Sequence, residues 1–258
     1  SEFNQPLDDS LNNCISLTNI IFDSNFNYPL ANSLDNCTKL SILAFGNGFN
    51  QPLDNSLDNC KKLSILAFGD GFNQPLANSL DNCTALTYIF FGNRFNQPLA
   101  NSLDNCTALT YINFGEFNQP LGDSLDNCTL LTCIRFGQRF SQRDELPTNI
   151  KSLGLNCNNT FYTEHLPETV EELELGQQFN LELCNLPSLI KKITFHKASK
   201  YNIELNCLPS KLLILQLPSW YVQQIHNIPH TLEKLICPSN YPFINDFAGI
   251  EVETYLPL

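Results

Sequence analysis

The four histidines are the first candidates for acid–base or metal chemistry. They are His165, His196, His226 and His230. None lies beside a carboxylate or a cysteine at the spacing of a catalytic triad or a metal site, and Pro229 keeps the last two off a common helix face. The sequence contains no phosphate loop, nucleophile elbow or paired-carboxylate signature either. We therefore expect no catalytic residues, no cofactor and no enzymatic activity.

The eleven cysteines could form disulfides, bind metal or act as buried apolar groups. Their number is odd, no Cys-x-x-Cys pair occurs, and six of them recur at regular intervals between leucines. These six are Cys14, Cys37, Cys60, Cys83, Cys106 and Cys128. A zinc site needs four converging ligands, whereas a cysteine in an apolar row behaves as a small hydrophobic residue. We predict a ladder of buried thiols with no bound metal, which implies a reducing compartment.

Aspartate and asparagine recur with the same interval. One column consists of Asp35, Asp58, Asp81, Asp104 and Asp126. We assign it to the starts of short turns, because the glycine-rich loop of calcium-binding solenoids is missing. Four Asn-Cys-Thr sequences fit the N-glycosylation pattern, which would matter only in a secreted protein. They begin at Asn36, Asn82, Asn105 and Asn127. The asparagines of a Phe-Asn-Gln-Pro segment should form a buried ladder that bonds to turn backbone.

These residues are positioned by an internal repeat. The string Phe-Asn-Gln-Pro-Leu, once with Tyr in place of Gln, recurs every 22 or 23 residues. Its copies begin at Phe3, Phe26, Phe49, Phe72, Phe95 and Phe117. We assign residues 1–145 to repeats of about 23 residues. Residues 146–240 keep the same pattern with Leu-Pro pairs every 20 to 22 residues, and residues 241–258 break the register as a C-terminal cap should.

Each repeat contains the pattern of one short strand. In the copy that starts at Phe72, Leu86-x-x-Ile89-x-Phe91 places Ile89 and Phe91 on one face at period two. Pro75 interrupts the return segment, where Leu80 and Cys83 lie one helical turn apart. The predicted fold class is an α/β solenoid, a leucine-rich-repeat-like right-handed superhelix. Its parallel sheet lines the concave face, and short helical or 3-10 turns and extended segments form the convex side.

Residues between the core positions of each strand should point to the concave face. There the N-terminal half presents apolar and aromatic side chains that suit a protein partner. The candidate protein-binding residues are Ile42, Ile65, Tyr88, Phe90, Tyr111, Asn113 and Arg135. The alternative is that these side chains only cover neighbouring strands. Further along, Glu171, Glu172 and Glu174 face Lys191 and Lys192, which indicates a cross-strand charge ladder.

Charge narrows the range of partners. The net charge is −12 and the pI is about 4.6, which argues against nucleic acid and anionic membrane surfaces as partners. No run of 18 apolar residues could span a bilayer. The chain has no methionine and begins inside a motif that recurs later, so we expect it to be part of a longer protein. An uncapped first strand would then favour end-to-end pairing.

The motifs resemble those of the FNIP-repeat family, leucine-rich-like repeats of social amoebae and amoebal giant viruses. The matching signature is Phe-Gly-x-x-Phe-Asn-Gln-Pro-Leu, at residues 45–53, 68–76 and 91–99, and the Leu-Pro pattern from residue 146 matches the family's other half-motif. The resemblance implies a substrate-recruiting array in the cytoplasm, or the host cytoplasm if viral. Skp1 and cullin would bind only through an upstream F-box that these residues lack. Ser-Leu-Asp-Asn-Cys-x-x-Leu also resembles surface BspA-like repeats, so an extracellular adhesion protein is the alternative.

Overall fold

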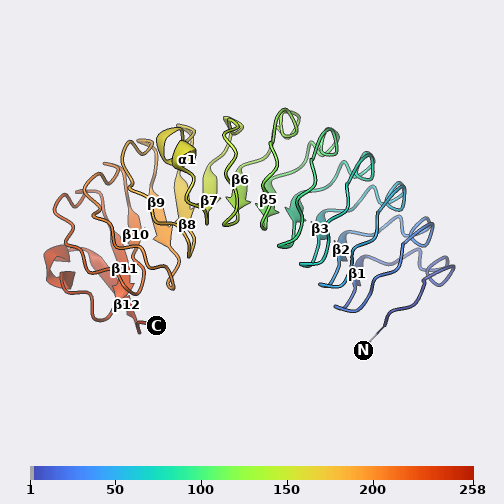
Figure 1. Ribbon diagram of the computed structural model, residues 1–258, viewed down its shortest axis with the longest axis horizontal. Coiled ribbons are helices and arrows are strands. Elements are labelled where there is room, and N and C mark those ends of the chain that lie inside the picture. The colour runs from blue at the N-terminus through green and yellow to red at the C-terminus, as the bar shows by residue number, and fades with distance from the viewer. Residues whose placement is uncertain (1–2) are drawn as a thin grey trace. The chain divides into compact units, whose positions relative to one another are not determined.

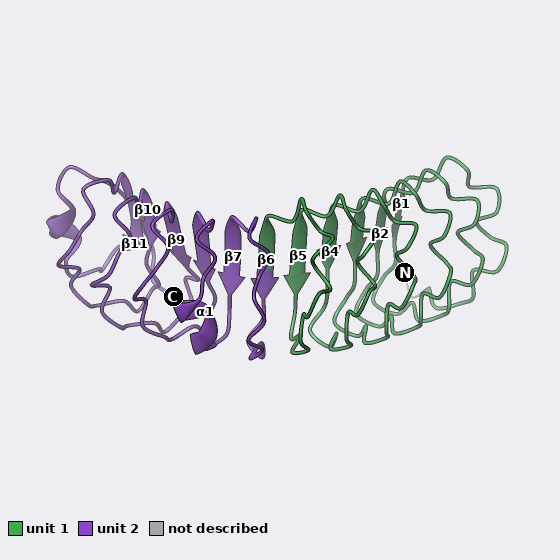
Figure 2. Cartoon of the chain, turned by 90° about the horizontal axis from the view of Figure 1, so that it is seen from above, with its two compact units in different colours: residues 1–134 green, residues 135–258 purple. Residues whose placement is uncertain are grey.

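The computed structural model describes residues 3–258, which form two compact units. Unit 1 comprises residues 1–134 and unit 2 residues 135–258 (Figure 2). Unit 1 contains strands β1 (Asn19–Ile21), β2 (Ile42–Ala44), β3 (Ile65–Ala67), β4 (Tyr88–Phe90) and β5 (Tyr111–Phe114). Strand β6 (Cys133–Phe136) spans the boundary. Unit 2 contains β7 (Ser152–Leu155), β8 (Glu172–Leu175), β9 (Lys192–Phe195), β10 (Ile214–Gln216), β11 (Lys234–Pro238) and β12 (Glu251–Tyr255).

Within each unit, every strand pairs in parallel with the next strand of the chain (Figure 1). Parallel neighbours separated by one repeat mean that each repeat makes one coil of a solenoid. The prediction of a leucine-rich-repeat-like solenoid with a parallel sheet is confirmed. The strands also begin at the residues that the period-two pattern places on the sheet.

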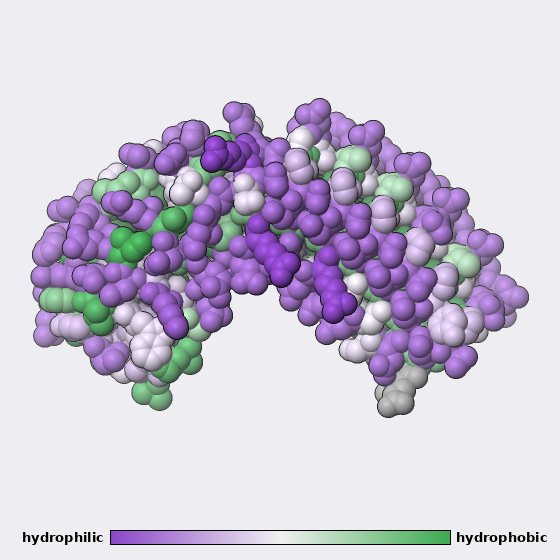
Figure 3. Space-filling model, in the orientation of Figure 1, coloured by the Kyte–Doolittle hydropathy of each residue, from purple (hydrophilic) through white to green (hydrophobic). Residues whose placement is uncertain are grey.

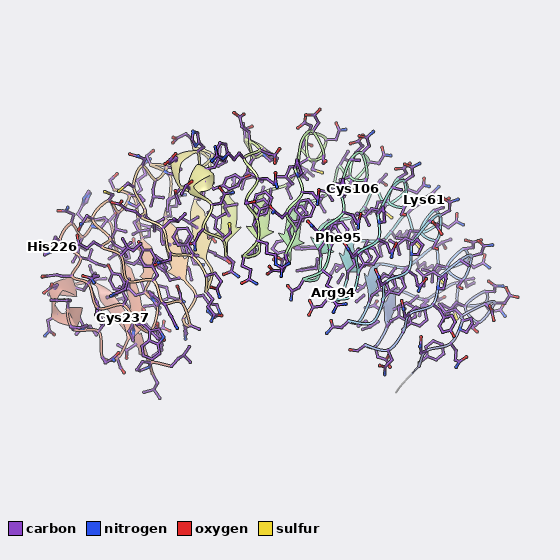
Figure 4. The ribbon with its side chains drawn as sticks, viewed as in Figure 1. Lys61, Arg94, Phe95, Cys106, His226 and Cys237 are labelled. Carbon is purple, nitrogen blue, oxygen red and sulfur yellow. The ribbon has the colours of Figure 1, made fainter. Side chains whose placement is uncertain are left out.

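The core of unit 1 is a double column of phenylalanine rings. Phe68 directly follows β3. Its ring stacks on that of Phe72, the first residue of the next Phe-Asn-Gln-Pro segment, with ring centroids 3.9 Å apart. Phe72 also stacks on Phe49 and Phe95 of the adjoining coils, at 6.0 and 5.9 Å. All of these rings are buried, and Phe95 is labelled in Figure 4. The Phe-Gly-x-x-Phe spacing is thus the spacing that pairs two rings within one coil.

The glycine of this motif allows adjacent coils to approach. A Cβ on Gly69 would collide with the backbone of Gly46 in the preceding coil. Any larger residue would push the two coils apart and weaken the ring stacking between them. The glycine is therefore required by packing between repeats.

The asparagines of the Phe-Asn-Gln-Pro segment form a ladder between coils. The backbone N–H of Asn73 donates to Asn50 Oδ1 at 2.8 Å, and the N–H of Asn96 donates to Asn73 Oδ1 at 2.9 Å. The ladder bonds to backbone as predicted, but the expectation that it is buried is wrong. Asn50 and Asn96 are exposed, because the segment runs along the outer surface of the coil.

The return segments of unit 1 are hydrogen-bonded turns, and their hydrogen bonds span three residues, as in the short 3-10 turns that the sequence predicted. The N–H of Ser79 donates to the Leu76 carbonyl and that of Cys83 to the Leu80 carbonyl, both at 2.9 Å. In unit 2, the helix α1 (Thr160–Glu164) is capped by Asn159, whose side chain accepts a hydrogen bond from the Phe161 N–H. The tail contains a 3-10 helix (Ile244–Phe247) and then β12, which pairs in parallel with β11. The tail therefore extends the sheet by one strand.

Tyrosine takes over the aromatic column in unit 2. Tyr201 stacks on Tyr221 with ring centroids 6.3 Å apart, and the tilted ring of Tyr241 follows at 6.0 Å. Tyr162 of α1 stacks on Phe140 at 5.7 Å. The Tyr162 hydroxyl donates to the Asp144 carbonyl at 2.8 Å, and that of Tyr241 to the Gln223 carbonyl at 2.9 Å. Such an acceptor offsets the cost of burying a tyrosine hydroxyl, and within residues 3–258 the Tyr201 hydroxyl has none.

Candidate protein-binding face

The open face of unit 1 is the outward side of β2–β5. Along each strand, one residue points into the core and its neighbours point outward, so that Leu66 and Ile89 are fully buried while Ile65 is half-buried. Six of the predicted binding residues lie on this face in adjacent strands. They are Ile42, Ile65, Tyr88, Phe90, Tyr111 and Asn113. The strand register makes them direct neighbours.

Three aromatic rings meet at the centre of the open face. The ring centroids of Phe90 and Tyr111 lie 5.1 Å apart, those of Tyr88 and Tyr111 5.8 Å, and those of Tyr88 and Phe90 6.4 Å. Tyr88 is 42% exposed, although it is a large aromatic residue in a strand. Phe90 is half-buried, and its partner in the neighbouring strand is the small residue Ala67. The rings therefore form an aromatic cluster that is only partly covered by the protein itself.

A column of hydroxyl residues borders the open face, and our sequence analysis did not single it out. The hydroxyl of Ser64 donates to the Ser41 carbonyl at 3.0 Å, that of Thr87 to the Ser64 carbonyl at 2.8 Å, and that of Thr110 to the Thr87 carbonyl at 3.1 Å. Each hydroxyl thus bonds to the preceding coil. The sequence feature that could have predicted this column is the Ser or Thr directly before each of the strands β2–β5. Because these hydroxyls have internal acceptors, the chemistry that the face offers is chiefly apolar and aromatic.

Arg135 belongs to unit 2, where it has an internal partner. Its Nε donates to Glu174 Oε2 at 2.9 Å and its second guanidinium nitrogen donates to Glu174 Oε1, so the ion pair is bidentate. The side chain crosses Gly154 of β7, where an added Cβ would lie 2.6 Å from Arg135 Cγ. The sequence did contain a sign of this ion pair: the same column of three successive strands holds an arginine, a glycine and a glutamate. The role of Arg135 in binding a protein stays a prediction.

Charges on the face of unit 2 compensate one another. Lys191 Nζ lies 2.7 Å from Glu171 and Lys192 Nζ 3.9 Å from Glu172, as the predicted charge ladder requires. Glu174 was expected to join this ladder, but it pairs with Arg135, whose fork fits both carboxylate oxygens. The hydrogen bond from Lys191 lowers the pKa of Glu171 below its usual range. This face is therefore charged where the open face of unit 1 is not.

The cysteines of the predicted ladder lie away from the open face, and most of them are buried. Of the cysteine ladder, Cys37, Cys60, Cys83 and Cys106 are fully buried, and Cys106 is labelled in Figure 4. The pKa values of Cys60 and Cys83 are raised to about 12. Burial is the largest cause, and the cysteine and aspartate of the preceding repeat are smaller causes. The predicted burial is confirmed for five of the six cysteines in the ladder, but it is wrong for Cys14, which is half-buried.

The four histidines all lie at the surface, including His226 in Figure 4. Within residues 3–258, no group of three or more His, Cys, Asp or Glu side chains is placed to hold a metal ion. In the same part of the chain, no helix is long and apolar enough to cross a membrane. The face seen in Figure 3 is largely hydrophilic, and hydrophobic residues reach it in small groups.

The sequence of unit 1 is similar to one known family of repeats. Residues 7–132 match the sequence profile of the BspA type leucine-rich repeat region in six copies. Most of unit 1 is therefore similar in sequence to BspA-type leucine-rich repeats. The aromatic cluster lies on the strands of two of these repeats, β4 and β5. A search of curated protein sequences finds no relative of the chain.

Solved structures share the fold. The internalin InlF of Listeria monocytogenes is 18% identical, with 99% of this chain and 78% of that chain covered and a TM-score of 0.63. Toll, in the Toll–Spätzle complex of Drosophila, is 17% identical over 98% of this chain and 38% of that chain, with a TM-score of 0.61. CroV588, a circular leucine-rich-repeat protein, is 24% identical over 88% of this chain, with a TM-score of 0.57. The chain spans 44% of the length of CroV588. These similarities show the solenoid fold alone.

Proposed function

We propose that this chain is a recognition module that binds a protein partner on the open face of unit 1. The observation that carries the proposal is the aromatic cluster of Tyr88, Phe90 and Tyr111, which lies among uncharged outward residues and is partly exposed. Aromatic side chains lose little conformational entropy on binding and cover a large apolar area, so they are the residues that most often dominate protein interfaces. The partner that fits this face presents an apolar, uncharged segment.

The charge distribution supports the choice of this face. A charged partner segment would leave its charge unpaired against Ile42, Ile65 and the rings, at a cost that the face cannot offset. On unit 2, the corresponding charges already pair with one another. A partner there would have to separate existing ion pairs before it gained new ones.

We further propose that the array recruits substrates as part of an F-box/FNIP-type ubiquitin-ligase receptor in the cytoplasm, with Skp1 and cullin bound by a segment outside this chain. The Phe-Gly-x-x-Phe-Asn-Gln-Pro-Leu signature supports this proposal, since each of its residues has a place in the solenoid: the phenylalanines in the core, the glycine at the coil contact and the asparagine in the ladder. The buried free thiols of the cysteine ladder are also suited to a reducing compartment.

The test is affinity capture of the natural full-length protein from its own cells, combined with chemical crosslinking. A variant with Tyr88, Phe90 and Tyr111 changed to alanine should lose its partner, with affinity lowered about 30-fold or more for each ring that acts as a hot spot. Trp220→Ala is the matched control, because this indole is also aromatic and 52% exposed but lies in unit 2. Crosslinks that place the partner on β2–β5, lost only in the triple variant, would support the proposed face.

The same capture experiment tests the ligase role separately. Skp1 and cullin should remain bound to the triple variant, because they do not depend on the open face. Their absence from every sample would refute the ligase role while leaving the proposed binding face intact. Equal partner binding by the triple variant and by the wild type would refute the binding face.

A second candidate is a surface adhesion protein of the BspA-like kind, which the match of residues 7–132 favours. In that case the protein would pass through the secretory route, and the exposed asparagines of the Asn-Cys-Thr sequences would be accessible to glycosylation. Asn82 is exposed while Cys83 beside it is fully buried. Glycans on Asn82 or Asn105 in protein purified from its natural source would favour this candidate, and unmodified asparagines would favour the cytoplasmic role.

A further inference from the structure

Two cysteines outside the ladder lie side by side on the surface of unit 2. Cys184 follows β8 and Cys207 follows β9, and their Sγ atoms are 3.2 Å apart although 23 residues separate them. Cys207 is exposed and Cys184 half-buried, whereas Cys60 and Cys83 of the ladder are fully buried. This pair therefore combines two features that the ladder lacks: reagents can reach it, and two thiols face each other.

A carboxylate completes the group. Glu182 Oε1 lies 3.3 Å from Cys184 Sγ, so the single S–H of Cys184 can donate either to this oxygen or to the sulfur of Cys207. These hydrogen bonds raise the pKa of Cys184 to about 12, with the bond to Cys207 the largest cause and burial the next. Cys184 is held as the thiol. Cys207 is then the cysteine that attacks first, because it is the more accessible of the two.

We propose that Cys184 and Cys207 are a redox-active dithiol that forms a reversible disulfide by exchange with a low-molecular-weight disulfide. A bonded pair of sulfurs is about 2.05 Å apart, so the two atoms need to approach by only about 1 Å from their present separation. Side-chain rotation can supply this on adjacent coils of one solenoid. The link would tie the coil after β8 to the coil after β9.

The exchange takes two steps, each with its own leaving thiolate. The Cys207 thiolate attacks one sulfur of the small disulfide, RSSR, whose S–S bond breaks, and the released RS⁻ takes up the proton that Cys207 lost. Cys184 then gives its proton to Glu182, and its sulfur attacks the Cys207 sulfur of the mixed disulfide. The second RS⁻ leaves and receives that proton. In sum, two protein thiols are oxidised to one disulfide, and RSSR is reduced to two RSH.

Closing this loop has a local consequence. The disulfide would enclose the coil that carries β9 (Lys192–Phe195), and this coil would then open less often to solvent. The proposal does not depend on which partner the open face of unit 1 binds. It adds a site on unit 2 that responds to the thiol–disulfide balance.

The test uses the full chain, reduced and then incubated with oxidised glutathione. Thiol titration after denaturation should fall from eleven to nine groups. Mass spectrometry of an unreduced tryptic digest should show the Cys184–Cys207 link, and reduced glutathione in excess should reverse it. Backbone amides of β9 should exchange hydrogen at least several-fold more slowly in the oxidised form.

Single variants separate the proposed steps. Cys184→Ser should stop at a mixed disulfide of glutathione on Cys207, whereas Cys207→Ser should react at least about 10-fold more slowly, because the thiolate that begins the exchange is gone. Cys133→Ser removes another half-buried thiol and should leave the link unchanged. The proposal is overturned if the wild type accumulates the mixed disulfide on Cys207 without the link. It is equally overturned if the link forms only in urea.

Discussion

Replacing Phe72 with alanine should remove about 4–5 kcal/mol from the unfolding free energy of unit 1. The ring is fully buried in the double phenylalanine column. It stacks on Phe68 of its own coil at 3.9 Å and on Phe49 and Phe95 of the adjoining coils at 6.0 and 5.9 Å. One substitution therefore weakens three coils of the array.

The magnitude follows from burial, the cavity and the ring contacts. Full burial of a phenylalanine side chain contributes up to about 3 kcal/mol, and the unfilled cavity brings a typical Phe→Ala loss to about 3–5 kcal/mol. Each stacked pair adds roughly 0.5–1.5 kcal/mol beyond its buried area, which places Phe72 in the upper part of that range. The coils on both sides of Phe72 also favour a larger loss of unfolding free energy, because they prevent the structure from collapsing into the cavity.

The assay is urea denaturation followed by far-ultraviolet circular dichroism, with peptide-resolved hydrogen exchange to locate the effect. Exchange should increase most in the three coils that contact Phe72, since a repeat array transmits its stability between neighbours. Phe3→Ala is the control: its ring is 42% exposed and stacks on Phe26, so its loss should cost about 1 kcal/mol or less. A loss under about 2 kcal/mol for Phe72→Ala, or equal losses for both variants, would refute the account of the core.

Three further predictions concern stability. Ala77→Gly should stabilise unit 1 by about 1 kcal/mol in urea denaturation, because Ala77 has a left-handed φ of 45° that penalises a Cβ; a destabilised variant would contradict this. Tyr201→Phe should be neutral or stabilising by about 1 kcal/mol, since its buried hydroxyl has no hydrogen-bond partner within residues 3–258. Tyr162→Phe should instead cost about 1 kcal/mol, because its hydroxyl bond is lost, and similar denaturation midpoints for the two variants would disprove the distinction. Raising the pH from 8 to 10 should destabilise unit 1, because burial raises the pKa of Cys83 to about 12 and only the unfolded thiol ionises in this window. Denaturation at both pH values should show a smaller decrease for Cys83→Ala, and an unchanged decrease would count against it.

The sequence by itself determined the solenoid. Its period of 22 or 23 residues, with Ile89 and Phe91 at period two in one copy, is enough to predict a strand per repeat and parallel pairing between repeats. A repeat cannot bury its apolar side alone, so the same pattern also requires stacking. The burial of Cys83 and the outward positions of Tyr88 and Tyr111 follow from the same alternation.

Only the tertiary structure decided which neighbouring side chains meet. Arg135 and Glu174 are 39 residues apart, and their pairing depends on Gly154 in the strand between them. Cys184 and Cys207 are separated by 23 residues, the interval of the cysteine ladder, but only the structure shows that they lie outside the core with their Sγ atoms 3.2 Å apart. The physical reason is that periodicity fixes the face on which a residue lies, whereas side-chain length and the space left by the next coil fix its contacts. The tail shows the same limit: its register breaks in sequence, yet backbone hydrogen bonds add β12 to the sheet.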